Sequence, residues 1–349
     1  MTKRRPFDAV LVISFGGPQG LADIRPFLAN VLRGRRIPPE RVDEVARHYE
    51  RFGGMSPLTA ITMKQAEGLR TRLKAAGLDI PVFVGMRNWH PLLQDTFSEM
   101  ADAGVRRAIG FISAAQRSYS SCTQYKQNVV DARTEIVHAG KPDVEVTYVD
   151  DWHEHEGFID ANARHVQEAL ASLPERERDR ARIVFTAHSI PQSMTGVARY
   201  QLQLQQSSRR VAERLGRDDW ALVYQSRSGR PEDPWLGPDI CEYLRAEHAR
   251  GLEAVVLCPI GFVCDHIEVL YDLDEEAAHV CREIGLPMAR AEAINDDPAF
   301  LDLMTDVVLK TWKRYEGGVP LTLAHPARPE RVEGPPPARG EPAARRIEK

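Results

Sequence analysis

The sequence predicts an α/β protein made of two similar Rossmann-like domains, each doubly wound around a parallel sheet. Three observations support this fold class. Short apolar runs rich in β-branched residues recur along the chain, longer amphipathic stretches alternate with them, and 349 residues are enough for about two domains. The apolar runs lack strict alternation, as expected for strands that are covered on both faces. Alternation of strands and helices favours parallel strands joined by right-handed crossovers.

The expected elements follow one another in chain order. Each strand candidate is a short apolar run, and each helix candidate has apolar residues at helical spacing. Strands are expected at 9–15, 81–86, 107–112, 144–149, 182–186, 221–225 and 254–258. Helices are expected at 60–76, 92–103, 123–138, 158–173, 203–215, 239–250 and 297–315.

The domain boundary is expected near residue 150, within 142–152. The first Rossmann-like half then covers 1–150 and the second covers 151–316. From Pro320 onward, 30 residues contain 7 of the 24 prolines, and no aromatic residue follows Tyr315. Such a stretch cannot bury enough apolar surface to offset its ordering entropy, so we expect residues 317–349 to form a disordered tail.

Composition argues against several classes of protein. The 46 Lys and Arg residues nearly balance 50 Asp and Glu, and a net charge of -4 argues against a strongly basic nucleic-acid binder. No run approaches the ~20 apolar residues that cross a bilayer, and the run at 9–15 is too short for a signal peptide. The five cysteines contain no CxxC pair, which fits a reducing compartment. We therefore expect a cytoplasmic protein without an integral membrane segment.

A glycine-rich turn follows the first expected strand. Its spacing, Phe15-Gly-Gly-Pro-Gln-Gly20, differs from the GxGxxG dinucleotide pattern. Pro18 also lacks one of the N–H groups that a phosphate cradle would use. We interpret the segment as a tight strand-to-helix turn and expect no nucleotide.

His188 lies just beyond the expected strand at 182–186. The carboxyl ends of parallel strands are where open α/β folds place their ligand sites. A neutral imidazole there can ligate a metal or accept a proton. The alternative is a structural histidine whose hydrogen bonds are satisfied within the fold.

An acidic row follows the strand at 254–258. Glu268, Asp272 and Glu276 are spaced i, i+4, i+8 and so share one face of a helix. Their mutual repulsion would be offset by a divalent cation. The alternative is a solvated helix start that the helix dipole favours. Cys258 and Cys264 flank the region, but their spacing matches no zinc pattern, which favours packing over metal ligation.

Three loops could border a ligand. Trp235, in the Pro- and Gly-rich loop 224–238, could form the wall of a site for a flat aromatic ligand or fill a gap between domains. In the loop 117–125, Ser121 or Thr123 is expected to cap the following helix, and the alternative is a polar edge for a ligand. The arginines and lysines of residues 1–36 suit a carboxylate-bearing ligand or a solvated surface; they are Lys3, Arg4, Arg5, Arg25, Arg33, Arg35 and Arg36.

Several motifs, in this order, closely resemble those of the ferrochelatase family. The first half contains LVISFGGPQG, NVLRGRRIP, HYERFGGMSPL, GMRNWHP and SYSSCTQY, and the second contains FTAHSIP, YQSRSG, PWLGPDI and CPIGFVCDHIEVLYDLDEE. The resemblance covers about residues 7–313. The motifs of the first half are most similar to those of the actinobacterial branch.

The resemblance implies a type II chelatase fold, in which two similar Rossmann-like halves enclose a cleft. It implies that Fe²⁺, as a substrate, is inserted into a porphyrin with release of two protons. The metal-site histidine and glutamate of the family fall on His188 and Glu268, which are therefore the expected catalytic residues. Asp272 and Glu276 continue the expected metal-binding row. Either His188 or Glu268 could deprotonate the porphyrin.

The resemblance also places porphyrin contacts at Ser56 and Tyr125. Rigid apolar walls, such as Phe15, could hold a distorted macrocycle. The sequence departs from some relatives at Phe15, where they carry an axial tyrosine, and at Asn88, where they carry histidine. Cys122 could match one cluster ligand of relatives that bind a [2Fe-2S] cluster, but no cysteine follows Cys281. We expect no cluster.

The expected substrate is coproporphyrin III, with protoporphyrin IX as the alternative. The actinobacterial resemblance favours coproporphyrin III, and so do the arginines near position 33, because this porphyrin has four propionates. A non-catalytic tetrapyrrole-binding protein is a third hypothesis. The expected partner is the porphyrin alone, without nucleic acid, and the resemblance allows transient contact with neighbouring enzymes of haem biosynthesis.

Overall fold

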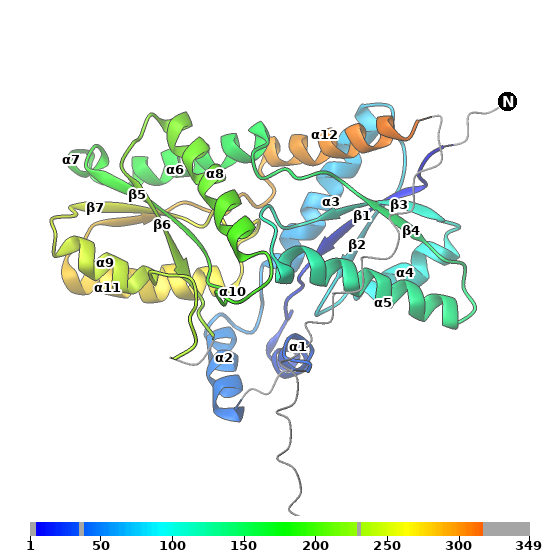
Figure 1. Ribbon diagram of the computed structural model, residues 1–349, viewed down its shortest axis with the longest axis horizontal. Coiled ribbons are helices and arrows are strands. Elements are labelled where there is room, and N and C mark those ends of the chain that lie inside the picture. Colours follow the sequence, from blue (N-terminus) through cyan, green and yellow to red (C-terminus); the bar gives the residue numbers. More distant parts are fainter. Residues whose placement is uncertain (1–4, 35–37, 229–231, 317–349) are drawn as a thin grey trace, which may run out of the picture.

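The computed structural model describes residues 5–34, 38–228 and 232–316, which form two α/β halves side by side (Figure 1). Each half contains a four-stranded parallel sheet. The first sheet has the order β2-β1-β3-β4, with β1 (Ala9–Ser14), β2 (Val82–Met86), β3 (Arg107–Ile112) and β4 (Glu145–Tyr148). The second has the order β6-β5-β7-β8, with β5 (Ala181–His188), β6 (Trp220–Gln225), β7 (Ala254–Cys258) and β8 (Met288–Arg290).

The two sheets repeat one topology. In each, the first strand of the half lies between its second and third strands, and the fourth strand follows the third at an edge. All seven expected strands form, and the predicted α/β class with two parallel Rossmann-like sheets is confirmed. The eighth strand, β8, was not predicted because its three residues are too few for a recognisable apolar run.

The seven expected helices also form, with ends shifted by a few residues. They are α3 (Leu58–Ala75), α4 (Leu93–Asp102), α5 (Gln124–His138), α6 (Glu156–Ser172), α8 (Val197–Leu215), α9 (Ile240–His248) and α12 (Pro298–Arg314). Three further helices were not predicted because charged residues outnumber apolar ones or because they are short: α1 (Ile24–Val31), α2 (Pro39–Arg51) and α7 (Glu175–Arg178).

The helix that carries the acidic row differs from the expected α-helix. It starts as α10 (Ile267–Val269), widens into a π-helix over Leu270–Ala277 and ends as α11 (Ala278–Ile284). The expectation of a regular α-helical face is therefore wrong, because Asp272 and Glu276 lie in the wider turn. Such π-helical turns are rare in proteins, and those that occur are often found at functional sites.

The two halves share one hydrophobic core. A single cluster runs from Phe7 and β1 through α3, α12 and α6 to β5 and β7. Helix α12, the last helix of the described chain, lies beside α3 of the first half (Figure 1). Gly68 permits this approach, since a Cβ atom there would lie 2.6 Å from Leu301 Cδ1. Arg72 Nε and Asp302 Oδ1 form an ion pair of 2.6 Å across the same contact.

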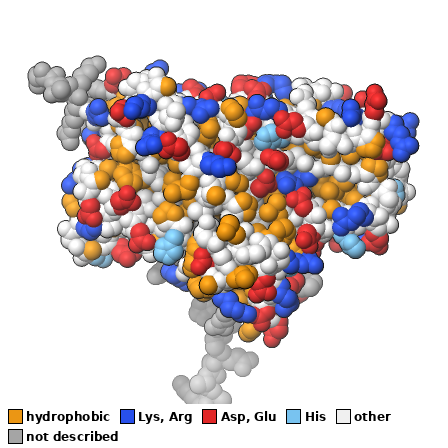
Figure 2. All heavy atoms as spheres, turned by 180° about the vertical axis from the view of Figure 1, so that it is seen from behind, with side chains coloured by type: hydrophobic (Ala, Val, Ile, Leu, Met, Phe, Trp, Pro, Cys, Tyr) orange, Lys and Arg blue, Asp and Glu red, His pale blue; other side chains and the backbone are white. Residues whose placement is uncertain are grey.

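The surface shows mixed charge. On the face seen in Figure 2, basic and acidic side chains are interspersed among hydrophobic ones, without a continuous basic patch. In the described part of the chain, no helix is both long enough and apolar enough to span a bilayer. The expected tail at 317–349 lies outside the described residues.

Candidate active site

His188 is the last residue of β5, at the carboxyl edge of the second sheet. The parallel register places it beside Gln225, the last residue of β6. The imidazole Nδ1 contacts the carbonyl oxygen of Ser189. A carbonyl only accepts hydrogen bonds, so in the neutral ring Nδ1 carries the proton and Nε2 keeps its lone pair. That Nε2 lies 3.9 Å from Glu268 Oε2.

Glu268 faces His188 from α10, and a second histidine holds it. His266 Nε2 lies 3.4 Å from Glu268 Oε2. Burial acts to raise the pKa of Glu268, but the hydrogen bond from His266 and the positive charges that His188 and His266 carry when protonated outweigh it and lower the pKa to about 2. Its side chain keeps 43% of its surface exposed. Glu268 is therefore an ionised, accessible carboxylate.

His266 is a site residue to which the sequence analysis gave no role. Its Nε2 approaches Glu268, whereas its Nδ1 is buried without a hydrogen-bond partner among the described residues. The ring of Phe262 lies 5.1 Å from the His266 ring, centroid to centroid. The spacing of His266 two residues before Glu268 was the available signal, but it does not fix which way either side chain points.

Asp272 is held by the end of β6. Gln225 Nε2 donates a hydrogen bond of 3.1 Å to Asp272 Oδ2, and the Ser226 hydroxyl donates to the same oxygen. Ser226 adopts a φ of 59°, a left-handed conformation that turns the chain at this point. Burial raises the pKa of Asp272 to about 7, with help from the negative charges of Glu268 and Glu276, although both hydrogen bonds act to lower it.

Glu276 ends the row on the π-helix, and its side chain is exposed. Partial loss of hydration and the charge of Asp239 raise its pKa, whereas a hydrogen bond from the Tyr271 hydroxyl acts to lower it. Among residues 5–34, 38–228 and 232–316, no three His, Cys, Asp or Glu side chains are grouped as a closed metal-binding set. The three carboxylates of the row are therefore separate from one another. Of the three, Glu268 lies within 4 Å of histidine nitrogens, those of His188 and His266.

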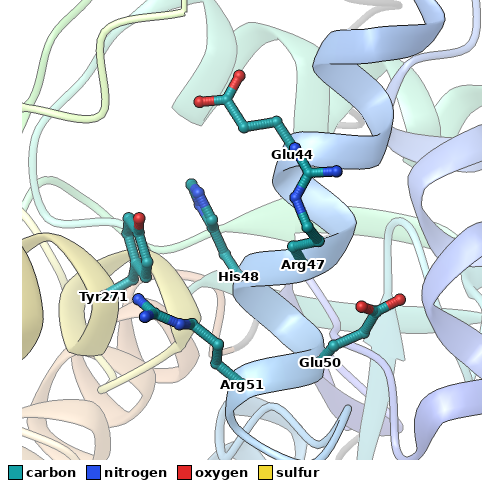
Figure 3. A pocket seen from close by; sticks show the side chains of 6 residues that line it. All are labelled: Glu44, Arg47, His48, Glu50, Arg51 and Tyr271. Atoms are coloured by element: carbon teal, nitrogen blue, oxygen red, sulfur yellow. The ribbon is translucent and has the colours of Figure 1, made fainter.

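Helix α2 of the first half covers the row from the other side. It lines an open cleft of about 670 Å³ together with Tyr271 of the π-helix (Figure 3). The rings of His48 and Tyr271 are stacked, with centroids 3.6 Å apart and planes at 12°. Arg51 Nη1 and Glu275 Oε2 form an ion pair of 2.6 Å beside the stack. Tyr49 of α2 is buried, and its pKa is raised by burial and by the charge of Glu268.

The expected porphyrin contacts lie in the first half, and both are buried. Ser56 is 3% exposed and packs against Gly17, where a Cβ atom would lie 2.6 Å from Ser56 Cβ. Tyr125 is 6% exposed at the start of α5, and the Arg87 guanidinium lies 5.6 Å from its ring centroid. Arg87 also lies 5.9 Å from the ring centroid of Phe15. Arg87 was not singled out in the sequence, because its role depends on contacts between β1, β2 and α5.

The remaining loops have structural contacts. Trp235 is half-buried, and its carbonyl accepts a hydrogen bond of 3.0 Å from Gln192 Nε2 in the segment after His188. Thr123 occupies the N-cap position of α5, as one of the two predicted alternatives, but its side chain makes no capping hydrogen bond. The side-chain cap lies one turn earlier: Ser118 caps the π-helical turn Tyr119–Thr123 that leads into α5, because its hydroxyl accepts from the Ser121 N–H at 3.1 Å while the Ser121 hydroxyl accepts from the Ser118 N–H.

The cysteines and the N-terminal arginines have local partners. Cys258 and Cys264 are buried, and burial raises the pKa of both thiols, that of Cys264 to about 12. Arg25 pairs with Asp43 at 2.9 Å, and Arg33 donates to Asn30 Oδ1 at 2.7 Å. Four of the basic residues lie outside the described chain: Lys3, Arg4, Arg35 and Arg36.

Comparisons with known proteins agree with this architecture. The sequence is 44% identical over 309 residues to a ferrochelatase of Rhodopirellula baltica, covering 88% of this chain and 87% of the relative. It is 41% identical over 334 residues to a coproporphyrin III ferrochelatase of Mycolicibacterium smegmatis, covering 95% and 94%. A coproporphyrin III ferrochelatase of Streptomyces coelicolor is 43% identical over 320 residues, covering 87% and 85%.

Solved structures show the same fold at lower identity. The sirohydrochlorin chelatase of Bacillus subtilis subspecies spizizenii, solved with cobalt, superposes with a TM-score of 0.52 at 10% identity, covering 88% of this chain and 97% of that protein. The family model for ferrochelatases matches residues 7–312, nearly the whole described chain. The chain belongs to the ferrochelatase family.

Proposed function

We propose that this protein inserts Fe²⁺ into coproporphyrin III and so forms coproheme. The observation that carries the proposal is the meeting of His188 Nε2 and Glu268 Oε2, 3.9 Å apart at the carboxyl edge of the second sheet. Metal insertion needs a group that accepts the two pyrrole protons and a ligand that delivers the metal. One imidazole with a free lone pair beside one ionised carboxylate supplies both.

The reaction is balanced without an electron carrier. Fe²⁺ and the porphyrin combine, the two pyrrole N–H bonds break, four Fe–N bonds form, and two protons leave. Glu268 remains ionised because its pKa is about 2, so it can ligate Fe²⁺ at neutral pH. The free Nε2 of His188 accepts the pyrrole protons in turn and passes each one to solvent, while Glu268 acts as the metal ligand. We assign the catalytic roles to these two residues.

The metal is proposed to reach Glu268 along Asp272 and Glu276. Carboxylates are suitable ligands for a hard or borderline divalent ion. Gln225 and Ser226 hold Asp272 in place from β6. The pKa of Asp272 is raised to about 7, so its carboxyl group loses its proton and becomes negatively charged near neutral pH.

The porphyrin is proposed to lie between α2 and the end of β5, with Ser56 and Tyr125 near its first-half edge. The basic side chains of α2, Arg47 and Arg51, border the cleft in Figure 3 and suit a substrate with four carboxylates. The actinobacterial relatives named coproporphyrin III ferrochelatases support this choice. Protoporphyrin IX remains the second candidate, because the same insertion chemistry applies to it.

The deciding experiment is anaerobic iron insertion with coproporphyrin III and protoporphyrin IX side by side. We expect a higher kcat/KM for coproporphyrin III, followed as loss of free-porphyrin absorbance and fluorescence. Preference for protoporphyrin IX would transfer the proposal to protoheme. Tight binding of either porphyrin without conversion would leave a tetrapyrrole carrier as the function. The same purified protein is expected to contain no [2Fe-2S] cluster, so iron and acid-labile sulfide above background would contradict that part.

A further inference from the structure

One arginine, Arg290, forms hydrogen bonds to the segment that contains His266, Glu268 and Asp272. Arg290 is the last residue of β8 and has a side chain only 14% exposed. Its Nη1 donates to Asp265 Oδ1 at 2.9 Å, and its Nε donates to Asp274 Oδ1 at 2.6 Å. Asp265 comes directly before His266, and Asp274 comes two residues after Asp272.

Asp265 is held by more than this arginine. Asn295 Nδ2 donates to Asp265 Oδ2 at 2.9 Å, and the Asp265 N–H donates to Asn295 Oδ1 at 2.8 Å. Asn295 adopts a φ of 46°, a left-handed conformation that is uncommon for a residue with a side chain. Its carbonyl accepts a hydrogen bond of 2.6 Å from Gln65 Nε2 of α3. The network therefore connects the segment to both β8 and the first half.

We propose that Arg290 is a positioning residue for metal binding, because it fixes both ends of the segment 265–274 and so sets the placement of Glu268 and Asp272. A guanidinium has a rigid, planar set of donors, which lets one side chain hold two carboxylates in fixed directions. Among the described residues, the Glu268 carboxylate has ion-pair contacts with His266 and His188 but not with an arginine or lysine. The inference rests on the proposed function, since it assigns a role in delivering the metal to that site.

The consequence is selective. Outer residues that orient metal-binding side chains typically change metal affinity or activity by about 10–100-fold when they are mutated. The proposed porphyrin contacts Ser56 and Tyr125 belong to the first half and have no bond to Arg290. Loss of Arg290 should therefore raise the KM for the metal and leave the KM for the porphyrin nearly unchanged.

Arg182 provides a matched control in the same half. It too bridges two carboxylates, since Nε lies 2.8 Å from Asp219 Oδ1 and Nη1 lies 2.7 Å from Glu247 Oε2. Its side chain is 23% exposed. It lies near the amino end of β5, whereas His188 ends the strand. Loss of Arg182 should cost stability without changing the use of either substrate.

The experiment compares R290M, R290K and D274N with R182M and the unchanged protein. Metal and porphyrin are varied separately in anaerobic insertion assays, and thermal unfolding is measured for each variant. We expect R290M to raise the metal KM by about 10–100-fold. R290K should recover part of this loss, because an ammonium group keeps the positive charge but lacks the planar set of N–H donors that binds two carboxylates. D274N, which frees only the π-helix end, should raise the metal KM by less.

The outcomes separate the inference from the function. Failure of the unchanged protein to insert iron would overturn the proposed function itself. With insertion established, a metal KM of R290M or D274N within about twofold of that of R182M would overturn the positioning role. If R290M does not fold, D274N decides the matter, because it removes the charge of a half-buried carboxylate and leaves the buried cation in place. Equal increases in both KM values would show a general loss of structure and would also overturn the inference.

Discussion

At the scale of single residues, the main result is how far apart in sequence the site is assembled. His188 and Glu268 are 80 positions apart but meet because β5 and β7 pair as neighbouring parallel strands and both chains leave the sheet at the same edge. The strand pattern placed His188 at a strand end, and the resemblance to the ferrochelatase family implied that Glu268 would act beside it. It could not predict that His266 turns towards Glu268, nor that Gln225 and Ser226 hold Asp272, because those contacts depend on side-chain directions and strand register.

The first prediction concerns His188. Replacement by alanine removes the imidazole that faces Glu268 and with it the proposed proton acceptor. We expect kcat to fall by about 10²–10⁴-fold, the usual contribution of a general base, while porphyrin binding persists. The measurement is initial rates of Fe²⁺ or Zn²⁺ insertion together with porphyrin fluorescence quenching. His138→Ala, at an exposed position of α5, is the control; full turnover by H188A would show that the assignment is wrong.

The second prediction uses the pKa of Asp272, which is raised to about 7 mainly by burial. Below this pH the carboxyl is protonated and neutral, so the metal KM should rise as the pH falls from 8 to 6. Asp272→Asn should remove this part of the pH dependence and have a high metal KM throughout. The measurement is metal KM against pH for both proteins. Parallel profiles would contradict the role of Asp272.

The same shift affects stability in the opposite direction. The folded state holds the proton of Asp272 more tightly than the unfolded chain, whose aspartate pKa is about 3.9. Stability from this group is thus present at low pH and is lost as the pH rises towards about 7. Asp272→Asn should therefore melt above the unchanged metal-free protein at pH 8, and the difference should shrink towards pH 5. The site keeps a carboxyl group that the fold alone does not favour.

At the scale of elements, α2 and the π-helix form a contact that crosses between the two halves. The sequence did not predict α2, because this highly charged segment has few apolar residues and obtains its order by packing on Ile267 and α1. The sequence also placed the acidic row on a regular α-helix, whereas local propensity does not distinguish an α-turn from a π-turn. Both features depend on tertiary packing, and both border the site.

The third prediction tests this contact. Tyr271→Ala removes the ring that stacks on His48, so α2 should lose protection against amide hydrogen exchange over residues 39–51. Arg51→Ala removes an exposed ion pair with Glu275, which should cost about 0–1 kcal/mol of stability, and also the guanidinium that lies 6.0 Å from the Tyr271 ring centroid. Both Y271A and R51A should raise the KM for porphyrin, because Tyr271 and Arg51 both line the cleft. Unchanged exchange in Y271A would show that the stack does not hold α2.

At the scale of the whole molecule, the sequence predicts the two parallel sheets well, but it does not predict that the two halves share one hydrophobic core. The parallel strand order followed from the alternation of strands and helices, and the structure confirms the fold class. Helix α12 packs on α3 of the first half as well as on its own half, and no pattern in the sequence predicts this contact. That contact depends on Gly68, which lies within an otherwise ordinary helical pattern. Leu301 packs directly against it and leaves no room for a Cβ atom.

The fourth prediction concerns this junction. Gly68→Leu would place a side chain where Leu301 Cδ1 already lies 2.6 Å from the position of a Cβ atom. Overpacking of this kind costs about 1–3 kcal/mol, so the melting temperature should fall. The measurement is thermal unfolding followed by circular dichroism. Gly77→Leu is not a suitable control, because Gly77 has a positive φ that would strain any other residue. Lys74→Leu, on the same helix, is the control; equal melting of G68L and the unchanged protein would contradict tight packing there.

The path of α12 also has a consequence for synthesis on the ribosome. Residues 58–75 of α3 emerge early, but the face that α12 covers stays without its partner until residues 298–314 have been made. Domains usually fold in order as they leave the ribosome. Here the first half is completed only when α12, the last helix of the described residues, has been made. We therefore expect nascent chains stalled before residue 298 to bind chaperones through α3, and chains released after residue 316 to escape them.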